Sequence, residues 1–176
     1  MSRSSILWVV ILVAVLIEAG CAGLSGEAQK KRILDLTAIN LVGLDGKPIK
    51  LTTYRNQLLL LDLFATWSQS TSIIVPAYIR LYQRYHPCGL AMVGIALDDI
   101  GAKVVEPFVS GMGIPYPVAL SGKDIREGRS PFGEIDFVPM LLVVGRDGRI
   151  LDVFAGLTPI AILEKAIQGA LGGRCP

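Results

Sequence analysis

The sequence predicts an α/β domain with a central mixed β-sheet flanked by helices on both faces. Two continuous apolar runs, Leu58 to Phe64 and Leu90 to Leu97, are typical of strands that are covered on both faces of a sheet. Apolar residues recur at helical spacing from Gln69 to Tyr85, and a crossover helix fits between Gly101 and Gly113. This alternation of strand and helix favours parallel strands at the centre.

Two turn dipeptides predict antiparallel hairpins at the two ends of the domain. Asp45-Gly46 lies between the apolar runs of "LVGLDGKPIKL", and Asp147-Gly148 separates "VPMLLVV" from "LDVFAG". A final helix is expected to begin near Pro159 with Thr158 as its cap and to end at Gly172. The expected order is hairpin, strand, helix, strand, helix, hairpin, helix.

Composition limits the classes of partner. The chain has 176 residues, 52% of them hydrophobic, which is enough for one buried core. Its net charge of +2 shows no electrostatic footprint for nucleic acid. One histidine and three separated cysteines give no metal-ligand spacing, and no glycine-rich phosphate loop precedes a helix. We therefore expect no nucleic acid, no metal and no cofactor.

Residues 1–20 have the pattern of a signal peptide, with Arg3 before an apolar run from Ile6 to Ile17. This run is shorter than the ~20 residues that span a bilayer. "AGC" at Ala19 to Cys21 resembles a bacterial lipobox, although Glu18 stands where an aliphatic residue is usual. We expect lipidation at Cys21, a tether over 21–32 and the folded domain over 33–176; cleavage without lipid and an uncleaved anchor remain alternatives.

Six segments in a fixed order carry a family resemblance that covers about Ile33 to Leu171. They are "LFATWSQST", Pro76, "IALDD", "GIPYPV", "FVPM" and "GRDGRI". The chain resembles the thioredoxin-like TlpA/ResA proteins of the AhpC/TSA-redoxin superfamily, which are tethered in the bacterial cell envelope. The resemblance implies a thioredoxin-like fold with an N-terminal β-hairpin extension.

The redox motif departs from this family at its two reactive positions. The resemblance places Ser68 and Thr71 where the family has the two cysteines of CxxC. A hydroxyl does not ionise near neutral pH as a thiol at a helix N-terminus does, and it forms no disulfide. Ile74 stands where related proteins often have a glutamate that assists proton transfer. Dithiol exchange through this motif is therefore excluded by its chemistry, and no intact catalytic residue is expected.

Other parts of the family site persist. Trp67 and Pro139 match positions that flank the cysteines, and the resemblance implies a cis peptide bond at Val138-Pro139. In the family, the backbone beside this proline pairs with an extended substrate. Asp62 falls where thioredoxins have a buried carboxylate beneath the cysteines; the alternative is an edge or hydrogen-bonded aspartate without function.

A serine nucleophile would need a nearby base, and the only histidine is His86. His86 is expected at the far end of the helix that Ser68 begins, about 25 Å away at 1.5 Å per residue. The simpler interpretation is that Ser68 or Ser70 caps this helix.

Cys88 and Cys175 form an even pair once Cys21 is assigned to lipid, and export would favour their oxidation. In the implied fold, the motif helix and the last helix lie on one face of the sheet and end at the same edge. We expect a structural disulfide between Cys88 and Cys175; two unpaired cysteines are the alternative.

The leading hypothesis is a membrane-tethered thioredoxin-like protein that faces the periplasm or another extracytoplasmic space. It would bind extended client polypeptides in envelope thiol homeostasis or cytochrome c maturation, without dithiol activity of its own. The alternative is a thiol-disulfide oxidoreductase or peroxiredoxin-like antioxidant enzyme that uses Cys88 or a partner's cysteines. A purely structural lipoprotein module is the third hypothesis.

Overall fold

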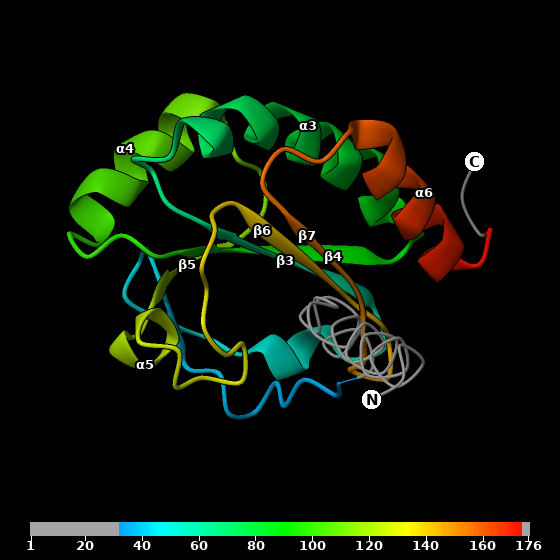
Figure 1. The fold of residues 1–176 in the computed structure, drawn as a ribbon, viewed down its shortest axis with the longest axis horizontal. Helices are drawn as coiled ribbons and strands as arrows, with labels where there is room; N and C mark the ends of the chain where they lie inside the picture. The colour runs from blue at the N-terminus through cyan, green and yellow to red at the C-terminus, as the bar shows by residue number, and fades with distance from the viewer. Residues whose placement is uncertain (1–31, 174–176) are drawn as a thin grey trace, which may run out of the picture.

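The computed structural model describes residues 32–173, which form one sheet with helices on both faces (Figure 1). The sheet has seven strands in the order β2-β1-β5-β4-β3-β6-β7. The strands are β1 (Leu41–Gly43), β2 (Pro48–Ile49), β3 (Leu58–Phe64), β4 (Leu90–Ala96), β5 (Val118–Ser121), β6 (Met140–Val144) and β7 (Ile150–Ala155). The helices are α3 (Gln69–Tyr85), α4 (Ala102–Met112), α5 (Lys123–Arg126) and α6 (Ile160–Leu171), with short 3-10 helices η1 (Leu51–Tyr54) and η2 (His86–Cys88).

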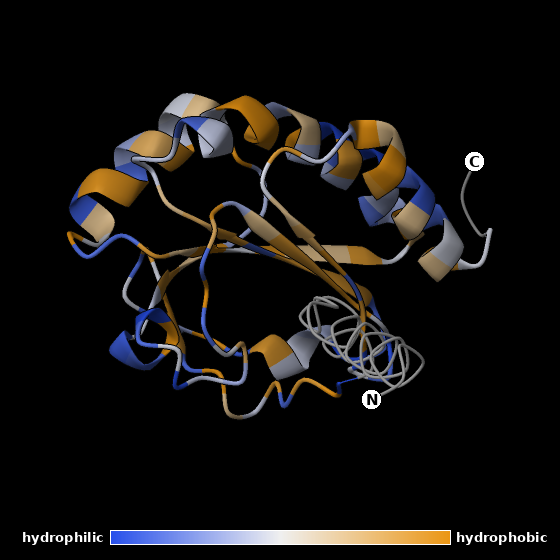
Figure 2. Cartoon of the chain, viewed as in Figure 1, coloured by the Kyte–Doolittle hydropathy of each residue, from blue (hydrophilic) through white to orange (hydrophobic). Residues whose placement is uncertain are grey.

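The central strand β3 is buried along its whole length, as its continuous apolar run predicts. It pairs in parallel with β4 on one side and antiparallel with β6 on the other. Every residue of β4 is buried as well. Orange strands at the centre of Figure 2 show this apolar interior, which fixes β3 and therefore the loop that follows it.

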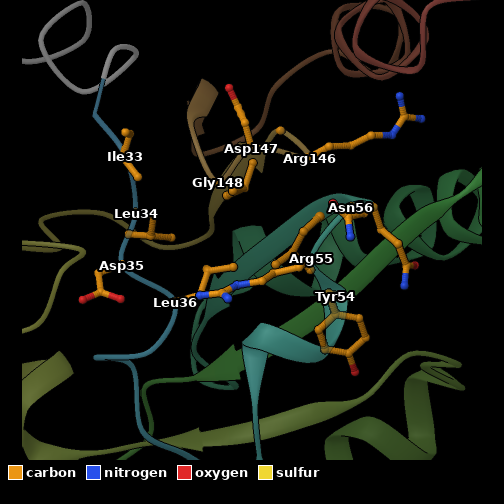
Figure 3. Close-up of a pocket in the computed structure, with 14 residues that line it drawn as sticks. Ile33, Leu34, Asp35, Leu36, Tyr54, Arg55, Asn56, Arg146, Asp147 and Gly148 are labelled. Carbon is orange, nitrogen blue, oxygen red and sulfur yellow. The ribbon is translucent and has the colours of Figure 1, made fainter.

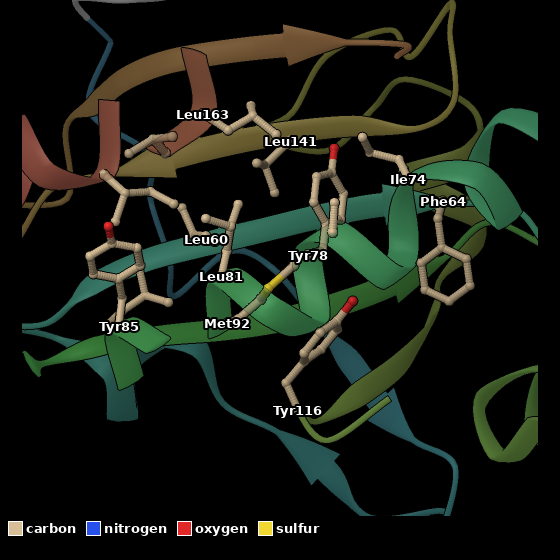
Figure 4. Close-up of a cluster of buried hydrophobic side chains, with 14 of the residues drawn as sticks. Leu60, Phe64, Ile74, Tyr78, Leu81, Tyr85, Met92, Tyr116, Leu141 and Leu163 are labelled. Atoms are coloured by element: carbon tan, nitrogen blue, oxygen red, sulfur yellow. The ribbon is translucent and has the colours of Figure 1, made fainter. Parts of the chain in front are cut away.

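The two faces of the sheet carry different layers. The long helices α3, α4 and α6 cover one face, and α5, η1 and the entry segment cover the other (Figure 1). The cluster under the long helices contains large side chains from α3 and α6, including Tyr78, Tyr85 and Leu163 (Figure 4). This cluster extends beneath the whole of α3, from one edge of the sheet to the other.

The hairpins and the predicted helices are confirmed. Leu41 pairs with Ile49 across the first turn, and Gly46 has a φ of 78°, a left-handed conformation that suits glycine. The α-helices α3, α4 and α6 lie within one or two residues of the expected bounds.

Two expectations about elements are corrected. Strand β5 was not expected, because "VALS" is too short to show a pattern; it joins the N-terminal hairpin to β4, so the hairpin belongs to the main sheet. Thr158 does not cap the last helix: Pro159 occupies the cap position, and no side chain caps the helix there.

Residues 1–31 and 174–176 lie outside the described part of the chain, and with them the predicted signal peptide, most of the tether, Cys21 and Cys175. Within the described part, Ile33 forms an isolated antiparallel bridge with Arg149, and the expected start of the domain at residue 33 stays a prediction. None of the helices within residues 32–173 is long and apolar enough to cross a membrane.

Candidate functional site

The motif loop lies at the carboxyl edge of β3, where residues 65–68 lead into α3. Its turn is held by Asp98, which follows β4 and is buried. The Asp98 carboxylate accepts hydrogen bonds from the Thr66 amide at 3.0 Å and from Thr66 Oγ1 at 2.6 Å. Asp98 is not among the site residues predicted from the sequence, although an acidic pair directly after a buried strand, in "IALDD", is a signal that could have indicated it.

Ser68 occupies the N-cap position of α3, but its side chain does not cap the helix. Its hydroxyl instead points to the Val138 carbonyl, with an Oγ to O distance of 3.4 Å. Ser70 lies inside the helix and makes no cap either. The predicted cap is therefore wrong, because the hydroxyl of Ser68 faces the neighbouring loop and not the helix amides.

The loop that faces Ser68 contains a cis peptide bond between Val138 and Pro139, in agreement with the family resemblance. The Pro139 carbonyl accepts a hydrogen bond from the Gly156 amide at 2.8 Å, which ties this loop to the end of β7. Among the described residues, no group accepts a hydrogen bond from the Val138 amide. One backbone donor therefore remains unpaired beside the cis peptide bond.

Large apolar side chains are exposed around this loop. Trp67 is 75% exposed and Phe137 is 67% exposed, and Leu157 beyond Gly156 is also exposed. Isolated exposed apolar residues are ordinary, but these three come from three segments that meet at the same edge of the sheet. The motif edge, by which we mean the sheet edge with residues 65–68 and the loop 137–139, thus has an unpaired backbone N–H group. Exposed apolar side chains surround that group.

Beneath Ser68, three buried polar atoms have no hydrogen-bond partner within the described structure: Asp62 Oδ1, Thr71 Oγ1 and the Tyr78 hydroxyl. Asp62 is 1% exposed and lies in the central strand, so the interpretation of an edge aspartate is wrong. Among the described residues, the only hydrogen-bond donor to the Asp62 side chain is the Tyr116 hydroxyl. It donates to Asp62 Oδ2 at the long distance of 3.5 Å.

Burial raises the pKa of Asp62 to about 7, because the charged carboxylate is poorly solvated there; the hydrogen bond from Tyr116 opposes this shift. Burial also raises the pKa of Tyr78, and the nearby Asp62 charge raises it further. The pKa of Tyr116 is raised well above its usual value for the same reasons. Asp62 is therefore the group beneath the motif that can change its charge near neutral pH.

The motif edge lacks the partners of a nucleophilic hydroxyl. His86 begins η2 at the other end of the 17-residue α3, about 25 Å from Ser68, and its Nδ1 lies 3.0 Å from the Leu90 carbonyl. Ile74, at the position of the family glutamate, packs into the core. Within residues 32–173 no group of three His, Cys, Asp or Glu side chains could hold a metal.

Cys88 lies at the far end of α3 and is half-buried against the core cluster. It is disulfide-bonded, so its sulfur is not a free thiolate. Its partner is not among the described residues, because the other two cysteines of the chain lie outside them. The pairing with Cys175 therefore stays a prediction; Leu171, at the end of α6, packs into the same cluster as Cys88.

Comparisons with known proteins agree with this geometry. The thiol-disulfide oxidoreductase ResA of Bacillus cereus is 24% identical over 177 residues, which is 96% of this chain and 98% of that relative. A thioredoxin-family thiol:disulfide interchange protein of Chlorobium tepidum superposes with a TM-score of 0.68 at 24% identity, over 80% of this chain and 98% of its own. The chain has a thioredoxin-like fold and is similar to thiol-disulfide oxidoreductases of the ResA/TlpA type.

The chain also shares its fold with more distant proteins. A secreted Mycobacterium tuberculosis disulfide oxidoreductase, homologous to E. coli DsbE, superposes with a TM-score of 0.65 at 13% identity, over 76% of this chain and 96% of its own. No family model matches the sequence. The named relatives are thiol-disulfide oxidoreductases, whereas this chain has hydroxyl side chains at the two motif positions.

Proposed function

We propose that the domain binds an extended client polypeptide at the motif edge and does not exchange disulfides through the motif. The observation that carries this proposal is the pairing of Ser68 with the Val138 carbonyl beside the cis Val138-Pro139 bond. The loop geometry of a redox site is present, and the two side chains that would do redox chemistry are hydroxyls.

The unpaired Val138 amide supports an extended client. A peptide strand that lies along residues 137–139 could accept a hydrogen bond from this amide, as in β-strand addition. Trp67 and Phe137 flank the loop and are mostly exposed, which favours a client with apolar side chains at this position. The client class is therefore an extended peptide with apolar side chains.

The proposed location is the cell envelope, with the domain tethered through its N-terminal segment. The signal-like pattern of residues 1–20 and the cysteine at position 21 support this placement. The secreted Mycobacterium relative has the same fold, and a disulfide at Cys88 suits an oxidising compartment. Clients would then be envelope polypeptides, including those of thiol homeostasis or cytochrome c maturation.

Trp67 provides the test of client binding. The chain has two tryptophans, so a Trp8→Phe variant leaves Trp67 as the single tryptophan reporter at the motif edge. We expect extended peptides with apolar side chains to shift its fluorescence with saturation, and scrambled polar peptides of equal length not to. A Val138→Pro substitution, which removes the amide donor, should weaken binding about tenfold while near-native circular dichroism is retained.

A disulfide reductase assay tests the absence of exchange. We expect the natural chain to be inactive and a Ser68→Cys, Thr71→Cys double variant to be active. Turnover by the natural chain would contradict the proposal and would assign a reactive thiol to Cys88 or Cys175. Peptide binding without turnover supports the proposal, and loss of both leaves a structural module.

A further inference from the structure

Strand β7 forms one end of the sheet, and within residues 32–173 no strand pairs with its outer side along its length. Its sequence, "ILDVFA", contains neither lysine nor proline, the residues that commonly protect an edge strand from pairing with another chain. The strand at the opposite end of the sheet is different. It is β2, which has two residues, one of them Pro48, and Lys47 and Lys50 flank it. The sequence of β7 therefore leaves an unprotected edge of six residues.

The hydrogen bonds at the end of β7 indicate which of its backbone groups face outward. The Gly156 amide donates to the Pro139 carbonyl at 2.8 Å, across the ladder between β6 and β7. In an antiparallel ladder, successive residues of a strand face the partner strand alternately. The N–H and C=O groups of Phe154 therefore point toward β6, and those of Val153 and Ala155 point away from it. The backbone groups of Val153 and Ala155 are thus available to a further strand.

The entry segment already pairs with the first residue of this edge. The Ile150 amide donates to the Arg32 carbonyl at 3.0 Å, and the Leu34 amide donates to the Gly148 carbonyl at 2.9 Å. These two bonds enclose an antiparallel bridge, and Figure 3 shows Leu34 beside the turn that contains Gly148. The side chains of Leu34 and Ile150 are both buried in the core on this face of the sheet. The chain therefore enters the domain as a strand partner of β7.

The direction of this pairing points along the free edge. Because the entry segment is antiparallel to β7, a strand that continues before Arg32 would run toward Ala155. A bulge after the first residue of β7 adds one residue to that strand. A partner strand that follows this bulge places Lys30 opposite Val153 and Ala28 opposite Ala155. Four residues at about 3.3 Å each are enough to reach the end of β7.

The sequence of residues 28–31, "AQKK", complements this edge. β7 has one charged side chain, Asp152, which follows the bulge, and Lys31 would lie opposite it. Opposite charges on two neighbouring strands stabilise their pairing. Lysines on the added strand would also protect the new edge of the sheet, which the sequence of β7 does not do.

We propose that residues 28–31 pair with the outer edge of β7 as an eighth strand of the sheet. The amides of Val153 and Ala155 then donate to carbonyls of this segment, which continues the pairing that the entry segment begins. The edge of β7 is closed to other chains, and the loop at Val138 remains the position at which an extended client can add a strand. The pairing itself does not depend on client binding.

The test follows hydrogen exchange of single amides by NMR, with the full chain in detergent micelles. In the natural chain we expect the amides of Val153 and Ala155 to exchange at least about tenfold more slowly than in a variant without the pairing. The Phe154 amide faces β6 and reports whether the ladder between β6 and β7 is intact. Fast exchange at Val153 and Ala155 in the natural chain overturns the proposal.

Two double substitutions differ in the direction of the N–H groups that they remove. Ala28→Pro with Lys30→Pro removes the two donors that would face β7. Gln29→Pro with Lys31→Pro removes the two that would face away from it, where an edge strand tolerates proline. Each pair replaces one lysine and one uncharged residue, so the change in charge is the same.

We expect the first pair to abolish the protection of Val153 and Ala155 and the second pair to retain it, with Phe154 protected in both. Equal effects of the two pairs overturn the proposal. Protection that is lost on about tenfold dilution of the natural chain would assign the outer partner of β7 to a second copy, which also overturns it. Client binding at Trp67 is measured separately, so failure of either proposal is distinguished from failure of the other.

Discussion

The two ends of α3 differ in how their buried polar groups are satisfied. At the motif end, Asp62 Oδ1, Thr71 Oγ1 and the Tyr78 hydroxyl have no hydrogen-bond partner within the described structure. At the other end, the Tyr85 hydroxyl donates to Glu164 at 2.7 Å and accepts from the Gln168 amide at 2.9 Å. Buried polar groups near the start of α3 therefore lack hydrogen-bond partners in the described structure, whereas the Tyr85 hydroxyl at its end has two.

This difference indicates where the fold is stabilised. A buried polar atom without a partner costs about 1 to 3 kcal/mol, so the motif end is held by the surrounding apolar core and not by its polar groups. At the other end, Arg84 also pairs with Glu164 at 2.8 Å, and Cys88 is disulfide-bonded. We infer that the far end stabilises the helix and that the motif end keeps the polar frame of a redox site without its sulfur atoms.

The largest expected effect comes from breaking the covalent bond at the stable end. If Cys88 pairs with Cys175, the disulfide closes a loop of about 87 residues and contributes roughly 4 kcal/mol in the loop-entropy model. Cys88→Ser and Cys175→Ser should each lower the free energy of unfolding by this amount in denaturant titrations, as should chemical reduction. Cys21→Ser is the control and should change nothing; a loss with Cys21→Ser but not with Cys175→Ser would reassign the pair.

The next largest effect tests the charge at the motif end. An aspartate carboxyl has an ordinary pKa of 3.8, which we take for Asp62 in the unfolded chain, whereas its pKa in the fold is about 7. Protonation of Asp62 therefore favours the folded state. The contribution of Asp62 to the free energy of unfolding is fully present below pH 3.8 and is lost as the pH rises to about 7. This contribution amounts to at most about 4 kcal/mol. Asp62→Asn should remove this pH dependence between pH 4 and pH 8, measured by denaturant titration.

Parallel pH curves for the natural chain and for Asp62→Asn would show that Asp62 is ionised in the fold at all these pH values. Asp99, exposed and paired with Arg126, provides the control. Asp99→Asn should leave the slope of stability against pH unchanged over this range.

The strands, helices and turns that depend on a local sequence pattern were predicted correctly from the sequence. The continuous apolar run of β3, the helical spacing of α3 and the turn at Asp147-Gly148 are all found as expected. These features follow from burial and turn chemistry, which act over a few residues. The family resemblance added the cis bond at Val138, which local pattern does not encode.

The contacts across the fold could not be predicted from local pattern. Asp98 reaches Thr66 over 32 residues, and Tyr85 reaches Glu164 over 79. The direction of the Ser68 hydroxyl depends on a loop 70 residues away, so the usual preference of serine for helix caps gave the wrong answer.

A matched pair of tyrosine variants should give effects of opposite sign. Tyr85→Phe removes two hydrogen bonds and leaves Glu164 and Gln168 with fewer partners, so we expect a loss of about 1 to 2 kcal/mol. Tyr78→Phe removes a buried hydroxyl that has no partner in the described part of the chain, so we expect no loss or a gain of up to about 1 kcal/mol. Both are measured by urea unfolding at one pH. Equal destabilisation by the two substitutions would mean that Tyr78 has a partner in solution, such as a bound water.

The smallest effect is expected at Thr71, the position of the second cysteine in the family motif. Its hydroxyl is fully buried and has no hydrogen-bond partner among residues 32–173, and valine has nearly the same shape. Thr71→Val should therefore change the free energy of unfolding by less than about 1 kcal/mol and in the stabilising direction. Peptide binding at Trp67 should also be unchanged, because the Thr71 side chain is fully buried. If Thr71→Val instead weakens peptide binding, the hydroxyl acts on the client through the helix end, and the unsatisfied polar groups beneath the motif are part of the binding site.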